Sequence, residues 1–168
     1  FTNGIETQRT LVNFQSDGTT RVNDLERSLD PATGITEETR RTYLEDGVGL
    51  LSSSFIRFSD PANPLVEIFA NYHDDGSTVS QRTTTSAVEG GVNILTERFY
   101  ASGQESYRGT TDGDNREIGT IITWHENGNV ATRTSYSNGI QHGLTERYNA
   151  AAQPTFIATY AFGEVVES

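Results

Sequence analysis

The sequence predicts an all-β protein, an elongated and twisted antiparallel meander of about six β-hairpin repeats. The first observation is an internal repeat, because several landmarks recur after a constant shift of 24 residues. They are Trp124, Gly128, Tyr136 and Gly139, which return as Tyr148, Ala152, Tyr160 and Gly163. The second is a series of Asp-Gly and Asn-Gly pairs, which favour tight hairpins. The third is the composition of the flanks, where Thr, Val, Ile, Tyr and Phe suit a half-buried pleated surface.

An aromatic residue followed four positions later by glycine marks each expected repeat. The pairs are Phe14 with Gly18, Tyr43 with Gly47, Tyr72 with Gly76, Phe99 with Gly103, Trp124 with Gly128, and the degenerate Tyr148 with Ala152. Successive aromatics are 29, 29, 27, 25 and 24 residues apart, so the period shortens along the chain. We therefore expect a single domain over 1–168, with repeats at approximately 4–33, 34–62, 63–89, 90–114, 115–138 and 139–162 and a tail at 163–168.

Each repeat is expected to hold two strands joined by a type I′ turn, since Asp, Ser or Asn precedes the repeated glycine. A second turn links one hairpin to the next. The linking pairs are Asn3-Gly4, Thr33-Gly34, Asn63-Pro64, Gly90-Gly91, Asp114-Asn115 and Asn138-Gly139. Two links carry an insertion that lengthens the early repeats, Asp30-Pro31-Ala32 and Asp60-Pro61-Ala62.

In chain order, this arrangement predicts about twelve strands and no helix. Residues 34–44 carry charges at helical spacing, but they occupy the place of a first strand in the other repeats, so we expect a strand there. Residues 24–29 are the second ambiguous segment. In the tail, Val165 and Val166 indicate half a strand.

The repeated aromatics are expected to align as a ladder, in which neighbouring rings add roughly 0.2–1 kcal/mol per pair. The ladder residues are Phe14, Tyr43, Tyr72, Phe99, Trp124 and Tyr148. The expected turn glycines are Gly18, Gly47, Gly76, Gly103 and Gly128. Counting outward from Gly103 also places Glu97 opposite Arg108 as a cross-strand ion pair.

Composition restricts the classes of partner. The chain has 23 acidic and 12 basic residues, a net charge of −11, so nucleic-acid phosphates and anionic membranes repel it. The absence of cysteine excludes disulfides and thiolate chemistry, and no apolar run approaches the roughly 20 residues that span a bilayer. The first residue is Phe1 and not methionine, which indicates a processed product or a fragment. A removed signal peptide is the simplest explanation, and it predicts an extracellular or cell-surface location.

The clearest motif lies in residues 119–163, where an aromatic precedes glycine by four positions and a Tyr-x-Asn-Gly-x-x-His-Gly phrase follows. Its residues are Trp124, Asn127-Gly128, Tyr136, Asn138-Gly139, His142-Gly143 and Tyr148. This motif resembles the variant MORN repeats of bacterial antitoxin-like repeat proteins. The resemblance implies an elongated, twisted sheet of successive hairpins, a scaffold or interaction role, and no catalytic residues.

The sequence contains no pattern typical of catalysis. It has neither a Gly-x-Ser-x-Gly elbow nor a glycine-rich phosphate loop, so we expect no enzyme and no cofactor. Asp112, Asp114 and Asn115 form a candidate calcium site, since alternating oxygen ligands suit a hard cation. Turn chemistry alone also accounts for these residues.

We expect a secreted structural subunit that associates with its own copies, head to tail through terminal strands, into a filament or surface layer. An open meander has two unpaired edges, and a head-to-tail contact does not close on itself. The residues expected in this contact are Phe1, Ile5, Phe156, Tyr160, Val165 and Val166. The alternative is a monomeric protein-interaction module of the antitoxin or scaffold type, and a glycan-binding groove is a third class. An open, a closed and a two-layered sheet are all compatible with the pattern.

Overall fold

The structure is a computed structural model that describes residues 7–60 and 64–167. These residues form thirteen β-strands and no helix. The strands are β1 (Gln8–Phe14), β2 (Arg21–Leu29), β3 (Thr36–Tyr43), β4 (Leu50–Phe58), β5 (Val66–Tyr72), β6 (Val79–Val88), β7 (Gly91–Phe99), β8 (Glu105–Asp112), β9 (Glu117–Trp124), β10 (Val130–Ser137), β11 (Ile140–Tyr148), β12 (Pro154–Ala161) and β13 (Glu164–Glu167).

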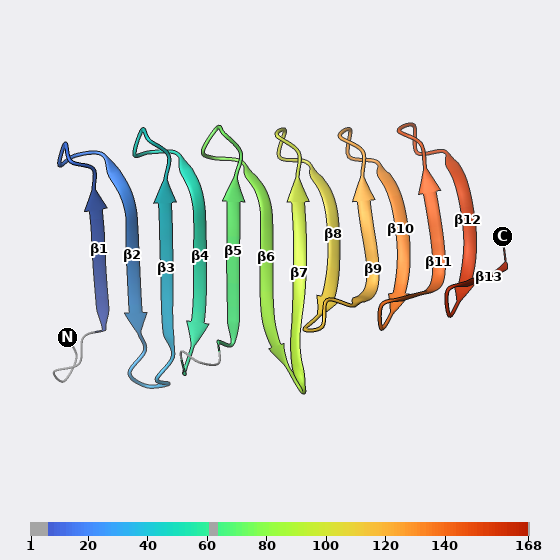
Figure 1. The fold of residues 1–168 in the computed structure, drawn as a ribbon, viewed down its shortest axis with the longest axis horizontal. Coiled ribbons are helices and arrows are strands. Elements are labelled where there is room, and N and C mark those ends of the chain that lie inside the picture. Colours follow the sequence, from blue (N-terminus) through green and yellow to red (C-terminus); the bar gives the residue numbers. More distant parts are fainter. Residues whose placement is uncertain (1–6, 61–63, 168) are drawn as a thin grey trace. The chain divides into compact units, whose positions relative to one another are not determined.

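The chain divides into two compact units, Phe1–Ala87 and Val88–Ser168. The first contains β1 to β6, apart from the last residue of β6, and the second contains β7 to β13. Within each unit, strands that are consecutive in the sequence pair side by side and antiparallel (Figure 1). The predicted all-β antiparallel meander is therefore confirmed.

The number of strands corrects the prediction of twelve. Residues Glu164–Glu167, in the tail where half a strand was expected, form a short thirteenth strand, β13. The turn at Phe162 and Gly163 reverses the chain, so β13 returns along β12 and pairs with its last three residues. The two ambiguous segments are strands, as expected: residues 34–44 contain β3, and residues 24–29 lie in β2.

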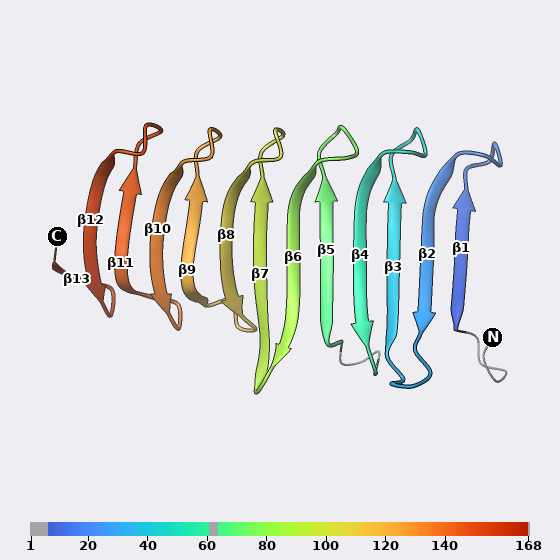
Figure 2. The ribbon, with the colours of Figure 1, turned by 180° about the vertical axis from the view of Figure 1, so that it is seen from behind.

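The turns at the repeated glycines correct a second expectation. Type I′ turns need positive φ at both central residues, but at the first of these turns only Gly18 has it, at 73°, and Asp17 does not. The Gly18 N–H donates to the Gln15 carbonyl at 3.0 Å, and the Gln15 N–H donates to the Thr20 carbonyl at 2.8 Å. Two-residue turns with positive φ at both positions occur instead in the links of the second unit (Figure 2), at Asn138-Gly139 and Phe162-Gly163.

Turn length explains part of the shortening period. In the first unit, the N–H of Gln15 reaches the carbonyl of a residue five positions on, Thr20. In the second unit, the N–H of Tyr100 reaches only four positions on, to Gln104. Each turn of the first unit is thus one residue longer, which adds to the effect of the insertions in its links.

Few apolar side chains are buried, because the described strands of each unit form one layer with two accessible faces. The buried apolar residues in the described ranges are Phe58, Ala70 and Ala158. Ala158 is the direct cross-strand partner of Thr145, and these two residues are 1% and 2% exposed. Cross-strand pairs and hydrogen bonds, not a core between layers, therefore hold the strands together.

Candidate functional site: the outer strands and their turns

The six ladder aromatics lie at equivalent places, each as the last residue of β1, β3, β5, β7, β9 or β11. Within a unit, an intervening strand separates successive members, which sets them about 10 Å apart. Their direct partners are other residues: Tyr43 pairs with Leu50, and Trp124 pairs with Val130. A stacked ladder along these positions therefore remains a prediction.

The turn glycines all adopt left-handed backbone conformations, as hairpin turns with a single left-handed residue require. Two of these turns touch in the first unit. A Cβ on Gly76 would lie 2.5 Å from the Gly49 Cα, and the Leu50 N–H donates to the Gly76 carbonyl at 2.7 Å. Consecutive hairpins are thus joined through their turns as well as through their strands.

A buried carboxylate in the first unit is the clearest polar cluster that the sequence did not indicate. Asp24 on β2 is buried, and it accepts hydrogen bonds from Tyr43 Oη at 2.6 Å and Arg41 Nη1 at 3.2 Å. Burial, and then the bond to Asp24, raises the pKa of Tyr43 above its ordinary value. The second guanidinium nitrogen of Arg41 binds Glu26 at 3.1 Å.

The second unit contains the predicted pair of Glu97 and Arg108. The two residues are direct partners on β7 and β8, and Arg108 Nη2 lies 3.5 Å from Glu97 Oε1. Arg108 also binds Glu105 through Nε at 2.8 Å. The buried carboxylates of Asp24 and Glu97 each lie beside an arginine, so removing either arginine would leave an uncompensated buried charge.

The candidate calcium loop is occupied by an arginine of its own turn. Arg116 lies 2.8 Å from Asp112 Oδ2 through Nε and 2.9 Å from Asp114 Oδ2 through Nη2. The Arg116 N–H, with further bonds in the turn, lowers the pKa of Asp112. Calcium would have to displace this guanidinium, and its binding at Asp112, Asp114 and Asn115 remains a prediction.

Four of the six residues expected in self-association are described by the structure. Phe156 and Tyr160 lie on β12 and are partly exposed, while Val165 and Val166 lie on β13 and are exposed. The other two, Phe1 and Ile5, lie outside the described residues, as does the link Asn3-Gly4. The Asn63 position of another expected link also lies outside them.

Exposed large apolar residues are concentrated in the first two strands of the first unit and the last three strands of the second. Of the fourteen such residues in the described ranges, nine lie in β1, β2, β11, β12, β13 or the turn before β13. These nine are Leu11, Phe14, Val22, Ile140, Leu144, Ile157, Phe162, Val165 and Val166. In the described structure, β1 pairs only with β2, so the other side of β1 offers its backbone groups to another strand.

Phe162 is the most unusual of these residues. It has a φ of 53°, a left-handed value that bulky side chains rarely adopt, and it is 80% exposed. Its ring lies 5.2 Å from the His142 ring. At the next residue of the turn, a Cβ built on Gly163 would lie 3.7 Å from the Cγ2 of Ile140.

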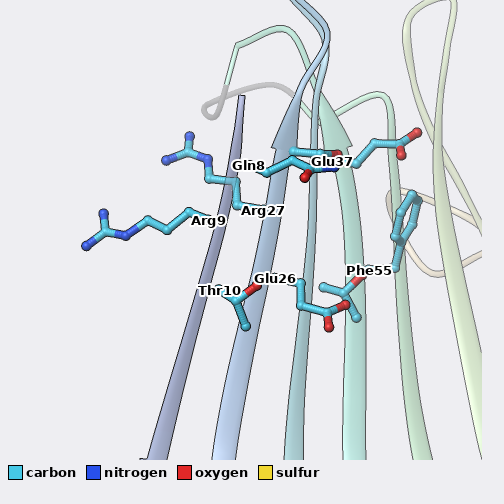
Figure 3. A pocket seen from close by; sticks show the side chains of 9 residues that line it. Gln8, Arg9, Thr10, Glu26, Arg27, Glu37 and Phe55 are labelled. Atoms are coloured by element: carbon cyan, nitrogen blue, oxygen red, sulfur yellow. The ribbon is translucent and has the colours of Figure 1, made fainter. Parts of the chain in front are cut away.

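The first unit has two shallow cavities at the start of β1. Figure 3 shows the larger, with Gln8, Thr10, Glu26, Glu37 and Phe55 on one side of the strands and Arg9 and Arg27 projecting to the other. A smaller cavity of about 230 Å³ involves these two arginines. Its lining residues are Thr7, Gln8, Arg9, Arg27, Leu29 and Thr36.

The repeat pattern of the sequence marks Phe162 as an exception. Phe162-Gly163 stands 24 residues after Asn138-Gly139, so phenylalanine replaces the residue type that suits a left-handed turn. The cavity at Arg9 and Arg27 had no comparable signal, because it depends on the pairing of three strands.

No protein-family model matches the chain, and no curated protein gives a significant match to it. Across the described residues, no helix has the length and apolar character that a bilayer crossing requires. The resemblance to bacterial MORN-variant repeats therefore remains a prediction, and function has to be argued from the geometry of the outer strands.

Proposed function

We propose that this protein is a non-enzymatic structural subunit that associates head to tail with copies of itself into an extracellular filament or surface layer. MORN-like hairpin repeats, about six along the chain, are part of this proposal. Its main support is the concentration of exposed apolar side chains in β1 and β2 of the first unit and β11 to β13 of the second, together with the unpaired side of β1. Strand addition at such an edge supplies main-chain hydrogen bonds and buries apolar surface together.

Charge favours contact between unlike edges over contact between like edges. β1 carries one charged residue, Arg9, whereas β13 carries Glu164 and Glu167. Two β13 strands paired antiparallel would set glutamates opposite one another, which is destabilising. Pairing of β1 with the β13 end of another copy brings opposite charges together. A contact between different surfaces of this kind grows into an open chain.

The alternative, a monomeric module that binds another protein through one sheet face, has one specific observation in its favour. Arg98 lies over the Tyr107 ring at 4.9 Å, and Arg147 lies over the Phe156 ring at 5.0 Å. Arginine and aromatic residues are enriched in protein interfaces. Direct cross-strand pairing places both stacks in one row, made by Arg98, Tyr107, Thr123, Thr132, Arg147 and Phe156.

Sedimentation and light scattering of the purified chain over a range of concentrations test the proposal. We expect a mass that rises with concentration without reaching a closed oligomer, and a weaker association at high salt because the edge charges are screened. Electron microscopy should show filaments or sheets. A chain that remains monomeric at every concentration would refute self-association and favour the alternative, whereas a closed dimer would refute the head-to-tail arrangement.

A matched pair of variants locates the contact. Leu11→Glu adds a charge to the exposed edge strand β1 and should weaken association, because it opposes the glutamates of β13. Leu51→Glu makes the same change on β4, an inner strand of the same unit, where leucine is similarly exposed (52% against 43%). The control should assemble like the wild type.

A further inference from the structure

Phenylalanine at position 162 is unfavourable for two reasons. A left-handed φ disfavours any bulky side chain, and an 80% exposed phenyl ring gains little from burial within its own chain. The corresponding position 24 residues earlier is Asn138, which meets the same backbone demand with φ of 53° and a polar side chain. An unfavourable conformation at an exposed residue points to an interaction outside its own chain.

Other exposed apolar residues lie near this turn. They are Ile140 at the start of β11 and Val165 and Val166 on β13, and Glu164 follows the turn directly. Because Val165 and Val166 are consecutive, their side chains point to opposite faces of the sheet. Aromatic side chains, phenylalanine among them, are enriched in protein interfaces.

The first unit offers a receptor of complementary charge. The cavity at Arg9 and Arg27 is a shallow depression of about 230 Å³ that is open to an incoming side chain. Strand pairing sets Arg9 directly opposite Arg27 and sets Leu29 opposite Thr36, all on one face. The cavity thus combines an apolar wall from Leu29 with two cationic groups that interact favourably with an aromatic ring.

The arginines of this cavity are also suited to a new partner. Arg27 lies over the Phe58 ring at 5.8 Å, and neither Arg9 nor Arg27 forms an ion pair within the described ranges. A carboxylate that arrives beside an inserted ring would therefore find free guanidinium groups. Glu164 is placed two residues after Phe162 to supply it.

We propose that Phe162 of one copy inserts into the cavity lined by Thr7, Arg9, Arg27, Leu29 and Thr36 of a second copy, with Glu164 against Arg9 and Arg27. This inference rests on the proposed self-association and identifies its anchor and its receptor. Both features lie beside links between hairpins: Phe162 lies in the link from β12 to β13, and Leu29 and Thr36 flank the link from β2 to β3. Parallel pairing of β13 in one copy with β1 in the other would place the starts of the two strands side by side and bring these two margins together.

The decisive variant is Phe162→Asn, which separates folding from association. Asparagine restores the Asn-Gly pair that suits this turn, so the melting temperature of the monomer should stay equal or rise. Association should weaken by roughly thirtyfold, the effect of removing a hot-spot residue. Val48→Asn is the matched control, because Val48 is also 80% exposed in a turn and lies away from both surfaces. It should leave association unchanged.

A charge exchange provides a test that does not depend on the turn. Arg9→Glu should weaken association, Glu164→Arg should weaken it as well, and an equimolar mixture of the two variants should recover mixed contacts between them. The pairing would be contradicted if the mixture does not recover association although circular dichroism shows that both single variants are folded.

The outcomes separate this inference from the proposal on which it rests. A wild-type chain that is monomeric at all concentrations overturns both. A wild-type chain that assembles, together with a Phe162→Asn variant that assembles equally well, overturns the Phe162 contact alone and leaves self-association standing. Loss of assembly in Val48→Asn would also count against a specific anchor.

Discussion

Asp17 and Asp75 hold the turns of the first unit through hydrogen bonds to the residues that follow them. The Thr20 hydroxyl donates to the Asp17 carboxylate, and the N–H groups of Thr19 and Thr20 donate to its Oδ1 at 2.8 and 2.9 Å. The hydroxyl bond, followed by the backbone bonds, lowers the pKa of Asp17 to about 2. Thr78 has the same effect on Asp75, whose pKa is also about 2.

These lowered pKa values predict a specific loss of stability in acid. Because the folded pKa lies below the ordinary 3.8, each ionised carboxylate stabilises the fold above that pH and loses this contribution as the pH falls toward about 2. The melting temperature of the Asp17→Asn, Asp75→Asn double variant should therefore fall less steeply between these values than that of the wild type. The measurement is a series of thermal melts against pH.

Asp74→Asn is the control for the acid experiment, since it changes a carboxylate next to Asp75 that makes none of the turn's described hydrogen bonds. It should retain the wild-type slope. A double variant with an unchanged slope would show that these two turns do not set the acid sensitivity.

At the scale of elements, contact between turns adds a constraint that single hairpins lack. Gly76 approaches the Gly49 backbone so closely that a Cβ at 2.5 Å has no flexible neighbour to displace. Gly18, in the equivalent turn between β1 and β2, has a similar φ of 73° and open space around it. The same chemical change therefore has different consequences at the two positions.

Gly76→Ala should destabilise the chain more than Gly18→Ala. Both substitutions place alanine at positive φ, which costs roughly 1–2 kcal/mol, and Gly76→Ala must also separate the two turns. The free energies of unfolding in urea give the comparison. Equal losses at the two positions would mean that the turns of β3–β4 and β5–β6 are not in contact in solution.

At the scale of the whole molecule, the scarcity of buried apolar side chains has a calorimetric consequence. The heat capacity change of unfolding rises with the apolar surface that unfolding exposes. A compact protein of this length has a value of about 2–2.5 kcal/mol/K, from about 12–15 cal/mol/K per residue. With Phe58, Ala70 and Ala158 as the buried apolar residues of the described ranges, this chain should have a clearly lower value.

Scanning calorimetry of the Phe162→Asn variant measures this quantity without a contribution from association. The wild type at high concentration should give a larger value, because contact between copies covers apolar side chains of the outer strands. A value in the ordinary range for the dilute variant would show that the two faces of the strands are covered within the chain itself.

Local sequence determined the antiparallel meander because its evidence is local. Glycines and Asp or Asn pairs mark where the chain reverses, and strand-forming flanks fill the spaces between reversals. The same counting placed Glu97 opposite Arg108 and identified residues 34–44 as strand β3 despite their helical spacing of charges. Alternation of side chains and turn chemistry require no knowledge of distant residues.

The tertiary structure decided the features that depend on which strands lie together. The type I′ prediction failed at Asp17-Gly18 because the Asp17 carboxylate accepts the following N–H groups and only glycine turns left-handed. The burial of Asp24, the approach of Gly76 to Gly49, and the cavity at Arg9 each join residues far apart in the sequence. Register between strands sets these contacts, and register is a property of the assembled sheet, which no single segment encodes.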